Sequence, residues 1–169
     1  MKIKLNNFSF LEVTGMELCS RKMKKEFAIE ILNWHYDPPY DLYNNVVTDE
    51  AIWELLNEGY IAIVNGREEL IGFYCSGQAA QVPVLRESGA YSEPAVDVGV
   101  GLDPKLTGQG FGNEFLSFIL YELEGLHIHS TFRLTVATFN KRAIKLYENM
   151  GFSMKSEFKT ENKFAFETL

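Results

Sequence analysis

Cysteine is scarce in this chain, and long apolar runs are absent from it. Only Cys19 and Cys75 occur among 169 residues, far apart and without Cys-x-x-Cys spacing. We expect two small buried side chains rather than a disulfide framework or a redox pair. No apolar run approaches the roughly 20 residues of a membrane-spanning helix, and the start, MKIKLNNFSF, lacks the apolar stretch of a secretory signal. No membrane partner is therefore expected, and a cytoplasmic location is predicted.

Positive charge is also in short supply. The chain has 16 Lys and Arg residues and 23 Asp and Glu residues, which gives a formal net charge of −7. Non-specific nucleic-acid binding needs a cationic surface, so no nucleic-acid partner is expected. The three histidines, His35, His127 and His129, have no cysteine or carboxylate at ligand spacing, which predicts no metal site. The acidic balance is compatible with a cationic small molecule or a basic peptide as partner.

The remaining composition is that of a globular protein. Hydrophobic residues make up 46% of the chain and charged residues 23%. The length suits one domain with a sizeable core. No repeat or linker-like stretch divides the sequence, so residues 1–169 are predicted to form a single domain.

Periodicity predicts an alternation of strands and helices. The expected helices are Lys22–Trp34, Thr48–Asn57, Gly112–Glu124 and Asn140–Met150. The expected strands are Lys2–Phe8 or Ser9–Val13, then Tyr60–Asn65, Leu70–Ser76, Val96–Leu102 and Phe132–Ala137, and a final hairpin of Phe152–Phe158 and Lys163–Glu167. Residues 81–94 are predicted to form a loop. The mixture favours an α/β or α+β class with a mixed central sheet.

The most informative segment joins the strand at Val96–Leu102 to the helix that begins near Gly112. Between them Gly108, Gly110 and Gly112 alternate with other residues. Glycines there let backbone N–H groups approach a ligand closely, and a helix N-terminus favours negative charge. The segment lacks the Gly-Lys-Ser/Thr ending of a P-loop and the G-x-G-x-x-G spacing of a dinucleotide fold. It predicts a phosphate or pyrophosphate site of another kind.

A second constellation lies in the helix near residues 140–150. Ala143 and Tyr147 are four residues apart on one helix face, with Asn140 at the start of that helix. A phenol so placed can donate a proton to a leaving group. Taken alone, a tyrosine at this position is more often a core residue than a proton donor.

Together the two constellations resemble the GNAT family of N-acetyltransferases. In that family a Q/R-x-x-G-x-G/A loop binds the coenzyme A pyrophosphate, and a later helix reads N-x-x-A-x-x-x-Y before Gly-Phe. Here the loop matches at 107–112, and the helix matches at Asn140, Ala143 and Tyr147, followed by Gly151 and Phe152. The resemblance implies a mostly antiparallel central sheet flanked by helices, with strands splayed at the cofactor site.

The resemblance also implies which residues hold acetyl-coenzyme A (acetyl-CoA). They are Val100, Gly101, Leu102, Thr107, Gly108, Gln109, Gly110, Phe111, Gly112, Asn140, Ala143 and Tyr147. The three strand residues would pair with the pantetheine arm, which Asn140 would also contact, and Tyr147 would protonate the departing thiolate. Gly99 and Gly101 would suit a bulged, splayed strand. The alternative is that these two glycines only accommodate packing.

One loop position departs from the family pattern. Thr107 stands where Arg or Gln is usual, so a long polar side chain is missing beside the pyrophosphate. Either affinity falls, or Gln109, Lys141 or Arg142 substitutes. An unchanged coenzyme A dissociation constant in a Thr107→Arg variant would show that this side chain does not limit binding.

The general base is predicted among carboxylates near the strand before the loop. Members of the family often use such a group, sometimes through water. Asp97 and Glu93 are the candidates, and Asp97 is favoured because an acid within a Val-rich strand must be exposed, paired or functional. An ordinary paired or edge carboxylate is the alternative.

The acceptor wall is predicted in the aromatic run after the first helix. Trp34, Tyr36, Asp37 and Tyr40 could hold an ammonium group through ring faces and charge. The same residues could instead form core and a turn. His35 reads as structural.

Three functions follow from these observations. The first is an acetyl-CoA-dependent N-acetyltransferase acting on a primary amine of a small molecule or peptide by direct attack, without a metal. The second is a non-catalytic GNAT-like module that senses coenzyme A or a metabolite. A nucleotide-binding regulator is the third, and the missing P-loop lysine counts against it. The state is predicted as monomer or homodimer, the latter if Lys163–Glu167 pairs across two copies.

Overall fold

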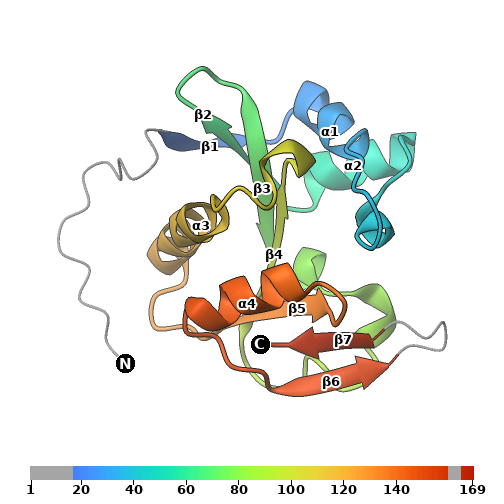
Figure 1. The fold of residues 1–169 in the computed structure, drawn as a ribbon, viewed down its shortest axis with the longest axis vertical. Coiled ribbons are helices and arrows are strands. Elements are labelled where there is room, and N and C mark those ends of the chain that lie inside the picture. The colour runs from blue at the N-terminus through green and yellow to red at the C-terminus, as the bar shows by residue number, and fades with distance from the viewer. Residues whose placement is uncertain (1–16, 160–164) are drawn as a thin grey trace.

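A mixed β-sheet runs through the residues that the computed structural model describes, 17–159 and 165–169. Its seven strands in those ranges lie in the order β1-β2-β3-β4-β5-β7-β6, and only β4 and β5 are parallel neighbours (Figure 1). The strands are β1 (Leu18–Lys22), β2 (Ile61–Asn65), β3 (Leu70–Ser76), β4 (Val96–Leu102), β5 (Phe132–Ala137), β6 (Ser156–Lys159) and β7 (Ala165–Thr168). The helices are α1 (Lys25–Leu32), α2 (Asp49–Asn57), α3 (Gly112–Leu126) and α4 (Lys141–Asn149). The predicted mixed, mostly antiparallel sheet flanked by helices is confirmed.

Helices cover both faces of the sheet. In β2 the side chains alternate: Ile63 belongs to the core under α3 and α4, whereas Ala62 and Val64 belong to the core under α1 and α2. This period of two is what places successive strand residues on opposite faces. Among the described residues, no helix combines the length and the apolar character needed to cross a membrane.

Local signals in the sequence account for most element ends. The Thr48 hydroxyl accepts a hydrogen bond from the Ala51 N–H at 3.1 Å and so caps α2. The side chain of Asn65 accepts from the N–H groups of Arg67 and Glu69, which closes the β2–β3 hairpin. Both elements appear where the sequence predicts them.

The start of the described chain differs from the prediction. β1 occupies Leu18–Lys22, so assigning Lys22 to a helix is wrong, and α1 begins only after Lys24, whose ψ of 162° is extended. The helix ends at Leu32, two residues before its predicted end at Trp34. β1 is a strand because it pairs with β2 throughout its length, which its own residues do not indicate. The strand expected at 2–8 or 9–13 lies outside the described residues.

The C-terminal hairpin is present, but its last strand, β7, does not lie at an edge of the sheet. β7 pairs with β5 on one side and with β6 on the other. Both of its edges are therefore occupied, and the idea that this strand pairs across a dimer is wrong for the described part, 165–168. Residues 163 and 164 lie outside the described ranges.

A close contact between two strands and a helix predicts a sensitive glycine. A Cβ at Gly72 in β3 would lie 2.5 Å from the Gly101 carbonyl oxygen and closer still to the Phe115 ring. We expect Gly72→Ala to lower the free energy of unfolding by about 1–3 kcal/mol, because backbone cannot move aside cheaply. Urea unfolding measures this. Gly125→Ala in α3 is the control, because a Cβ there would meet no atom within 4 Å other than its chain neighbours and its own helix backbone. This variant should raise the free energy of unfolding by up to about 1 kcal/mol. Equal effects would contradict the packing argument.

Candidate active site

A cleft opens where β4 and β5 part. Their parallel pairing covers only three residue pairs and ends at Val98 with Leu134. After this pair, β4 continues to pair with β3 and β5 pairs with β7. The edges of β4 and β5 that face each other therefore diverge. The cleft has a volume of about 900 Å³ and is lined by both strands, the glycine loop, α4 and the segment between α1 and α2. The predicted splay is confirmed.

The predicted bulge in β4 is wrong. The register between β3 and β4 is continuous from Gly72 with Leu102 to Ser76 with Val98. A Cβ at Gly101 would enter the Phe73 ring, and one at Gly99 would lie 2.8 Å from Sγ of Cys75. These glycines therefore accommodate packing against β3, as the alternative reading proposed.

The glycine loop leads from β4 into α3. Gly108 and Gly110 have φ values of 75° and 82°, a backbone conformation that favours glycine. The Thr107 hydroxyl donates to the Pro104 carbonyl at 2.8 Å, and the Gln109 amide donates to the Lys105 carbonyl. Both polar side chains are thus engaged by their own turn, and the loop offers mainly backbone donors to a ligand.

Most of the predicted cofactor residues meet around the cleft. Those lining it are Val100, Gly101, Leu102, Thr107, Gly108, Gly110, Gly112, Asn140, Ala143 and Tyr147. Gln109 and Phe111 do not line it, and Phe111 is buried against Phe115 with ring centroids 6.3 Å apart. The structure therefore brings the two distant motifs to one place, and binding by these residues stays a prediction.

Asn140 occupies the junction between β5 and α4. Its side-chain oxygen accepts from the Ala143 N–H at 3.1 Å and caps the helix, as predicted. Its amide nitrogen donates to the Tyr43 hydroxyl at 3.2 Å. The two contacts fix the orientation of the amide.

Tyr147 lies in α4 and belongs to the core between that helix, α3 and the sheet. It is only 6% exposed, and its ring packs against Phe152 at 6.3 Å. Burial, with a smaller contribution from Tyr43, raises the pKa of the Tyr147 phenol above its ordinary value. A phenol is protonated at neutral pH even at its ordinary pKa of about 10, so the Tyr147 hydroxyl carries a proton that it can donate.

Three tyrosines from the segment between α1 and α2 reach across the cleft. Tyr36 donates to the Leu102 carbonyl at 2.8 Å, at the end of β4. Tyr43 accepts from Asn140, as above, and the Tyr40 ring lies under the Arg142 guanidinium with 4.0 Å between centroid and Cζ. Sequence reasoning missed Tyr43, although the spacing of the three tyrosines by four and three residues marks it as their companion.

The predicted acceptor residues are only partly together. Trp34, Tyr36 and Tyr40 line the cleft, and Trp34 stacks on Phe73 at 6.0 Å. Asp37 is exposed and does not line it. The charged side chains of the described lining are Arg142 and Lys145.

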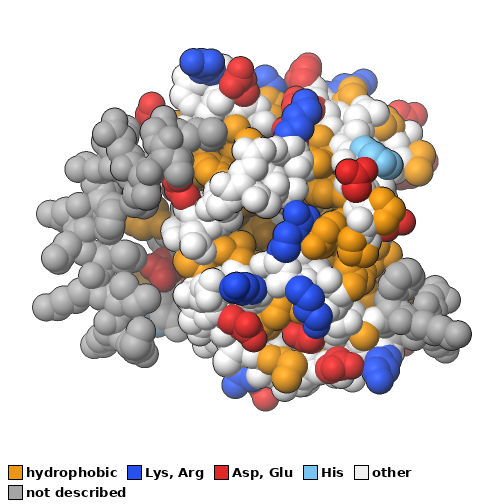
Figure 2. Space-filling view, in the orientation of Figure 1, with side chains coloured by type: hydrophobic (Ala, Val, Ile, Leu, Met, Phe, Trp, Pro, Cys, Tyr) orange, Lys and Arg blue, Asp and Glu red, His pale blue; other side chains and the backbone are white. Residues whose placement is uncertain are grey.

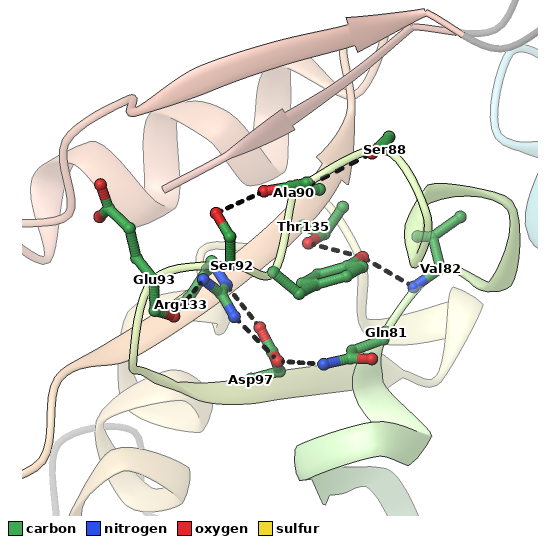
Figure 3. Close-up of polar contacts among 11 residues, drawn as sticks. Gln81, Val82, Ser88, Ala90, Ser92, Glu93, Asp97, Arg133 and Thr135 are labelled. Atoms are coloured by element: carbon green, nitrogen blue, oxygen red, sulfur yellow. Dashed lines mark hydrogen bonds and ion pairs between the residues drawn. The ribbon is translucent and has the colours of Figure 1, made fainter.

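Asp97 lies in a buried ion pair at the base of the fork. Its two carboxylate oxygens accept from Nε and Nη2 of Arg133 at 2.6 and 3.1 Å, and one also accepts from Gln81 at 2.7 Å (Figure 3). Asp97 and Arg133 are register partners in β4 and β5 and are 5% and 8% exposed. The pair joins the two strands one residue before their last register pair, Val98 with Leu134.

The same network ties down the loop before β4. The Arg133 guanidinium lies over the Tyr91 ring at 5.1 Å and donates to the Glu93 carbonyl at 3.0 Å. The side chain of Glu93 is exposed and points away from Asp97 (Figure 3). Neither carboxylate lines the cleft. Their role as general base stays a prediction, and for Asp97 the geometry supports the paired alternative.

Buried phenols and a thiol predict sensitivity to alkali. Burial raises the pKa of Tyr36 and Tyr147, and it raises that of Cys75 to about 12. In the unfolded chain these groups ionise from about pH 9 to 10, while the folded protein keeps their protons. The free energy of unfolding should therefore be unaffected by them below about pH 8, and it should fall as the pH rises through the unfolded pKa of the thiol and then of the phenols, by up to about 1.4 kcal/mol per group and pH unit. Urea unfolding at pH 8, 9.5 and 10.5 measures this, and unchanged stability would contradict it.

The comparisons with known proteins agree with this geometry. The profile of the acetyltransferase (GNAT) family matches residues 28–152, so the chain belongs to that family of acyltransferases. A search of curated proteins found no significant match.

Solved structures share the fold at low sequence identity. A mutant of the spermidine N-acetyltransferase SpeG from Vibrio cholerae is 17% identical, with a TM-score of 0.61 over 90% of this chain and 92% of that one. A GNAT-family acetyltransferase from Bacillus anthracis is 14% identical, with a TM-score of 0.59, and the match covers 90% of this chain and 92% of that one. A protein described as a phosphinothricin N-acetyltransferase is 18% identical, with a TM-score of 0.64, and the match covers 90% of this chain and 96% of that one.

Proposed function

We propose that this protein is an acetyl-CoA-dependent N-acetyltransferase that acts on a primary amine by direct attack. The observation that carries the proposal is the fork between β4 and β5, which brings the glycine loop, Asn140 and Tyr147 around one cleft. Acetyl-CoA would supply the thioester that the amine attacks. The neighbours named for spermidine and phosphinothricin acetylation support an amine acceptor.

The cleft fits a linear ligand that ends in phosphates. Residues 99–102 of β4 lie beyond the last pair with β5, so the edge of residues 99–101 is available to a pantetheine arm, whereas Tyr36 already engages the Leu102 carbonyl. The loop that follows turns at Gly110, where an added Cβ would have no atom within 4 Å, so the space beside this residue is open. Close approach of a pyrophosphate to the loop N–H groups is thereby possible.

Tyr147 and a base would handle the protons. The Tyr147 phenol lines the cleft and is protonated at neutral pH, so it would donate its proton to the departing sulfur. Asp97 remains the candidate base only by way of intervening water, because Arg133 and Gln81 engage its carboxylate. Glu93 is the weaker candidate, since its side chain points away from the fork.

A second function, a non-catalytic sensor of coenzyme A, has one observation in its favour. Tyr36 and Tyr43 already hold the Leu102 carbonyl and the Asn140 amide, the groups expected to contact pantetheine. A ligand that displaces these two tyrosine contacts would couple its binding to a local rearrangement, which suits a sensor. The predicted single domain, cytoplasmic location and monomeric or homodimeric state remain proposals.

Thiol release separates the two functions. The full chain is incubated with acetyl-CoA and a panel of primary amines, including polyamines, amino acids and peptide N-termini, and free thiol is measured over an amine-free control. Release that depends on one amine supports the enzyme. Coenzyme A binding by calorimetry without release over the panel supports the sensor, and the lack of binding contradicts both.

A further inference from the structure

The glycine loop brings no positive side chain to its own anion site. Residues 107–112 contain neither Lys nor Arg, and the side chains of Thr107 and Gln109 hydrogen-bond to the preceding turn. A pyrophosphate bound at the loop N–H groups would then lack the charge-assisted contact that Arg provides well, with its two parallel N–H donors.

Arg142 places a guanidinium beside this loop from a different element. Its Nη1 lies 3.3 Å from where a Cβ of Gly108 would be, and the side chain lines the cleft. Lys141, its neighbour on α4, does not line the cleft. Lys and Arg side chains gather over α4 on this face of the molecule (Figure 2).

Tyr40 holds Arg142 in that position. The guanidinium Cζ lies 4.0 Å above the Tyr40 ring, which in turn packs against Phe139 with centroids 6.3 Å apart. A cation held over a ring loses less freedom when it binds an anion, and its fork of donors stays open at the edge of the guanidinium plane. Tyr40 is thus a positioning residue for Arg142.

We propose that Arg142, positioned by Tyr40, makes the cationic contact to the pyrophosphate of coenzyme A that Thr107 cannot make. The inference rests on the proposed coenzyme A site and deepens it. It selects one of the three substitutes that the sequence leaves open, because the Gln109 amide is engaged and Lys141 lies off the cleft. Arg142 is exposed, so its variants should fold.

Calorimetry with three ligands tests the contact. Arg142→Gln should raise the dissociation constants of coenzyme A and of 3′-dephospho-coenzyme A equally, by about tenfold to a hundredfold, and leave that of pantetheine unchanged. Lys141→Gln removes one positive charge from the same helix turn and should change all three much less. Loss confined to coenzyme A would place Arg142 at the 3′-phosphate and overturn the pyrophosphate assignment. Unchanged constants would also overturn it, whereas failure of the unmodified protein to bind coenzyme A would overturn the proposed function itself.

Two further variants test the positioning and the substitution. Tyr40→Leu should weaken coenzyme A binding about twofold to fivefold, and Tyr40→Phe, which keeps the ring, should not. Thr107→Arg in the Arg142→Gln background should restore affinity, because it returns the guanidinium to the loop. A Tyr40→Phe variant as weak as Tyr40→Leu, or no rescue by Thr107→Arg, would contradict the proposal.

Discussion

A Tyr147→Phe variant is expected to lose about 10²- to 10⁴-fold in kcat for amine acetylation, the range that positioned proton donors contribute. Only the hydroxyl is removed, and the ring that packs on Phe152 stays. The fold and the affinity for coenzyme A should therefore be unchanged. Steady-state thiol release, calorimetry and thermal unfolding measure the three quantities.

Tyr74→Phe is the matched control for this prediction. Tyr74 is buried in the same core, at 4% exposure, but does not line the cleft. Its variant should keep full kcat. If Tyr147→Phe also kept kcat, the phenol would be a core residue and the leaving thiolate would take its proton from elsewhere.

An Arg133→Met variant is expected to lose about 3–5 kcal/mol of the free energy of unfolding. Removing one partner of a buried ion pair leaves the other charge in a site from which water is excluded. Here the stranded group is the Asp97 carboxylate, left with Gln81 as its remaining partner. Because the pair joins β4 to β5, we expect the fork to loosen as well.

The controls for this prediction use charge and exposure. Replacing both partners, Asp97→Leu with Arg133→Met, should recover much of the loss, since no unpaired charge stays buried. Arg21→Met breaks the exposed pair with Glu68 and should unfold at nearly the same urea concentration as the unmodified protein. A small loss in Arg133→Met, similar to that in Arg21→Met, would contradict the argument.

Asp97→Asn separates an anchor from a base. As an anchor, Asp97 affects stability, while kcat per folded enzyme and its pH profile stay the same. As a base, it controls the rate at neutral pH and the acidic limb of the profile. A full rate at neutral pH would remove Asp97 from the mechanism.

Elements with strong local signals were predictable from the sequence. The Asn65 hairpin, the Thr48 cap and the Asn140 cap each depend on a side chain and the backbone two to four residues away. The strand β1 was not predictable, because LCSRK has no apolar alternation and becomes a strand by pairing with β2. The position of β7 between β5 and β6 also depends on pairing between distant residues.

In the candidate site, too, the local motifs were predictable and the contacts between distant residues were not. The glycine loop and the Asn140–Tyr147 helix carry their spacing in the chain, so the sequence alone indicates the family. The partners of Asp97, Asn140 and Gly108 could not. Arg133, Tyr43 and Arg142 are separated from them in sequence by 36, 97 and 34 residues, respectively, and come close only through the sheet register and helix packing.

Local conformations and the two motifs follow from the sequence, because each depends on residues that are close together in the chain. What those motifs face depends on how distant segments pack. The tertiary structure turned a carboxylate in a valine-rich strand into half of a buried ion pair, and it showed the two strand glycines to be packing accommodations. It also set an arginine of α4 beside a loop that has no cation of its own. Such contacts depend on distances between remote residues, which a linear pattern does not contain.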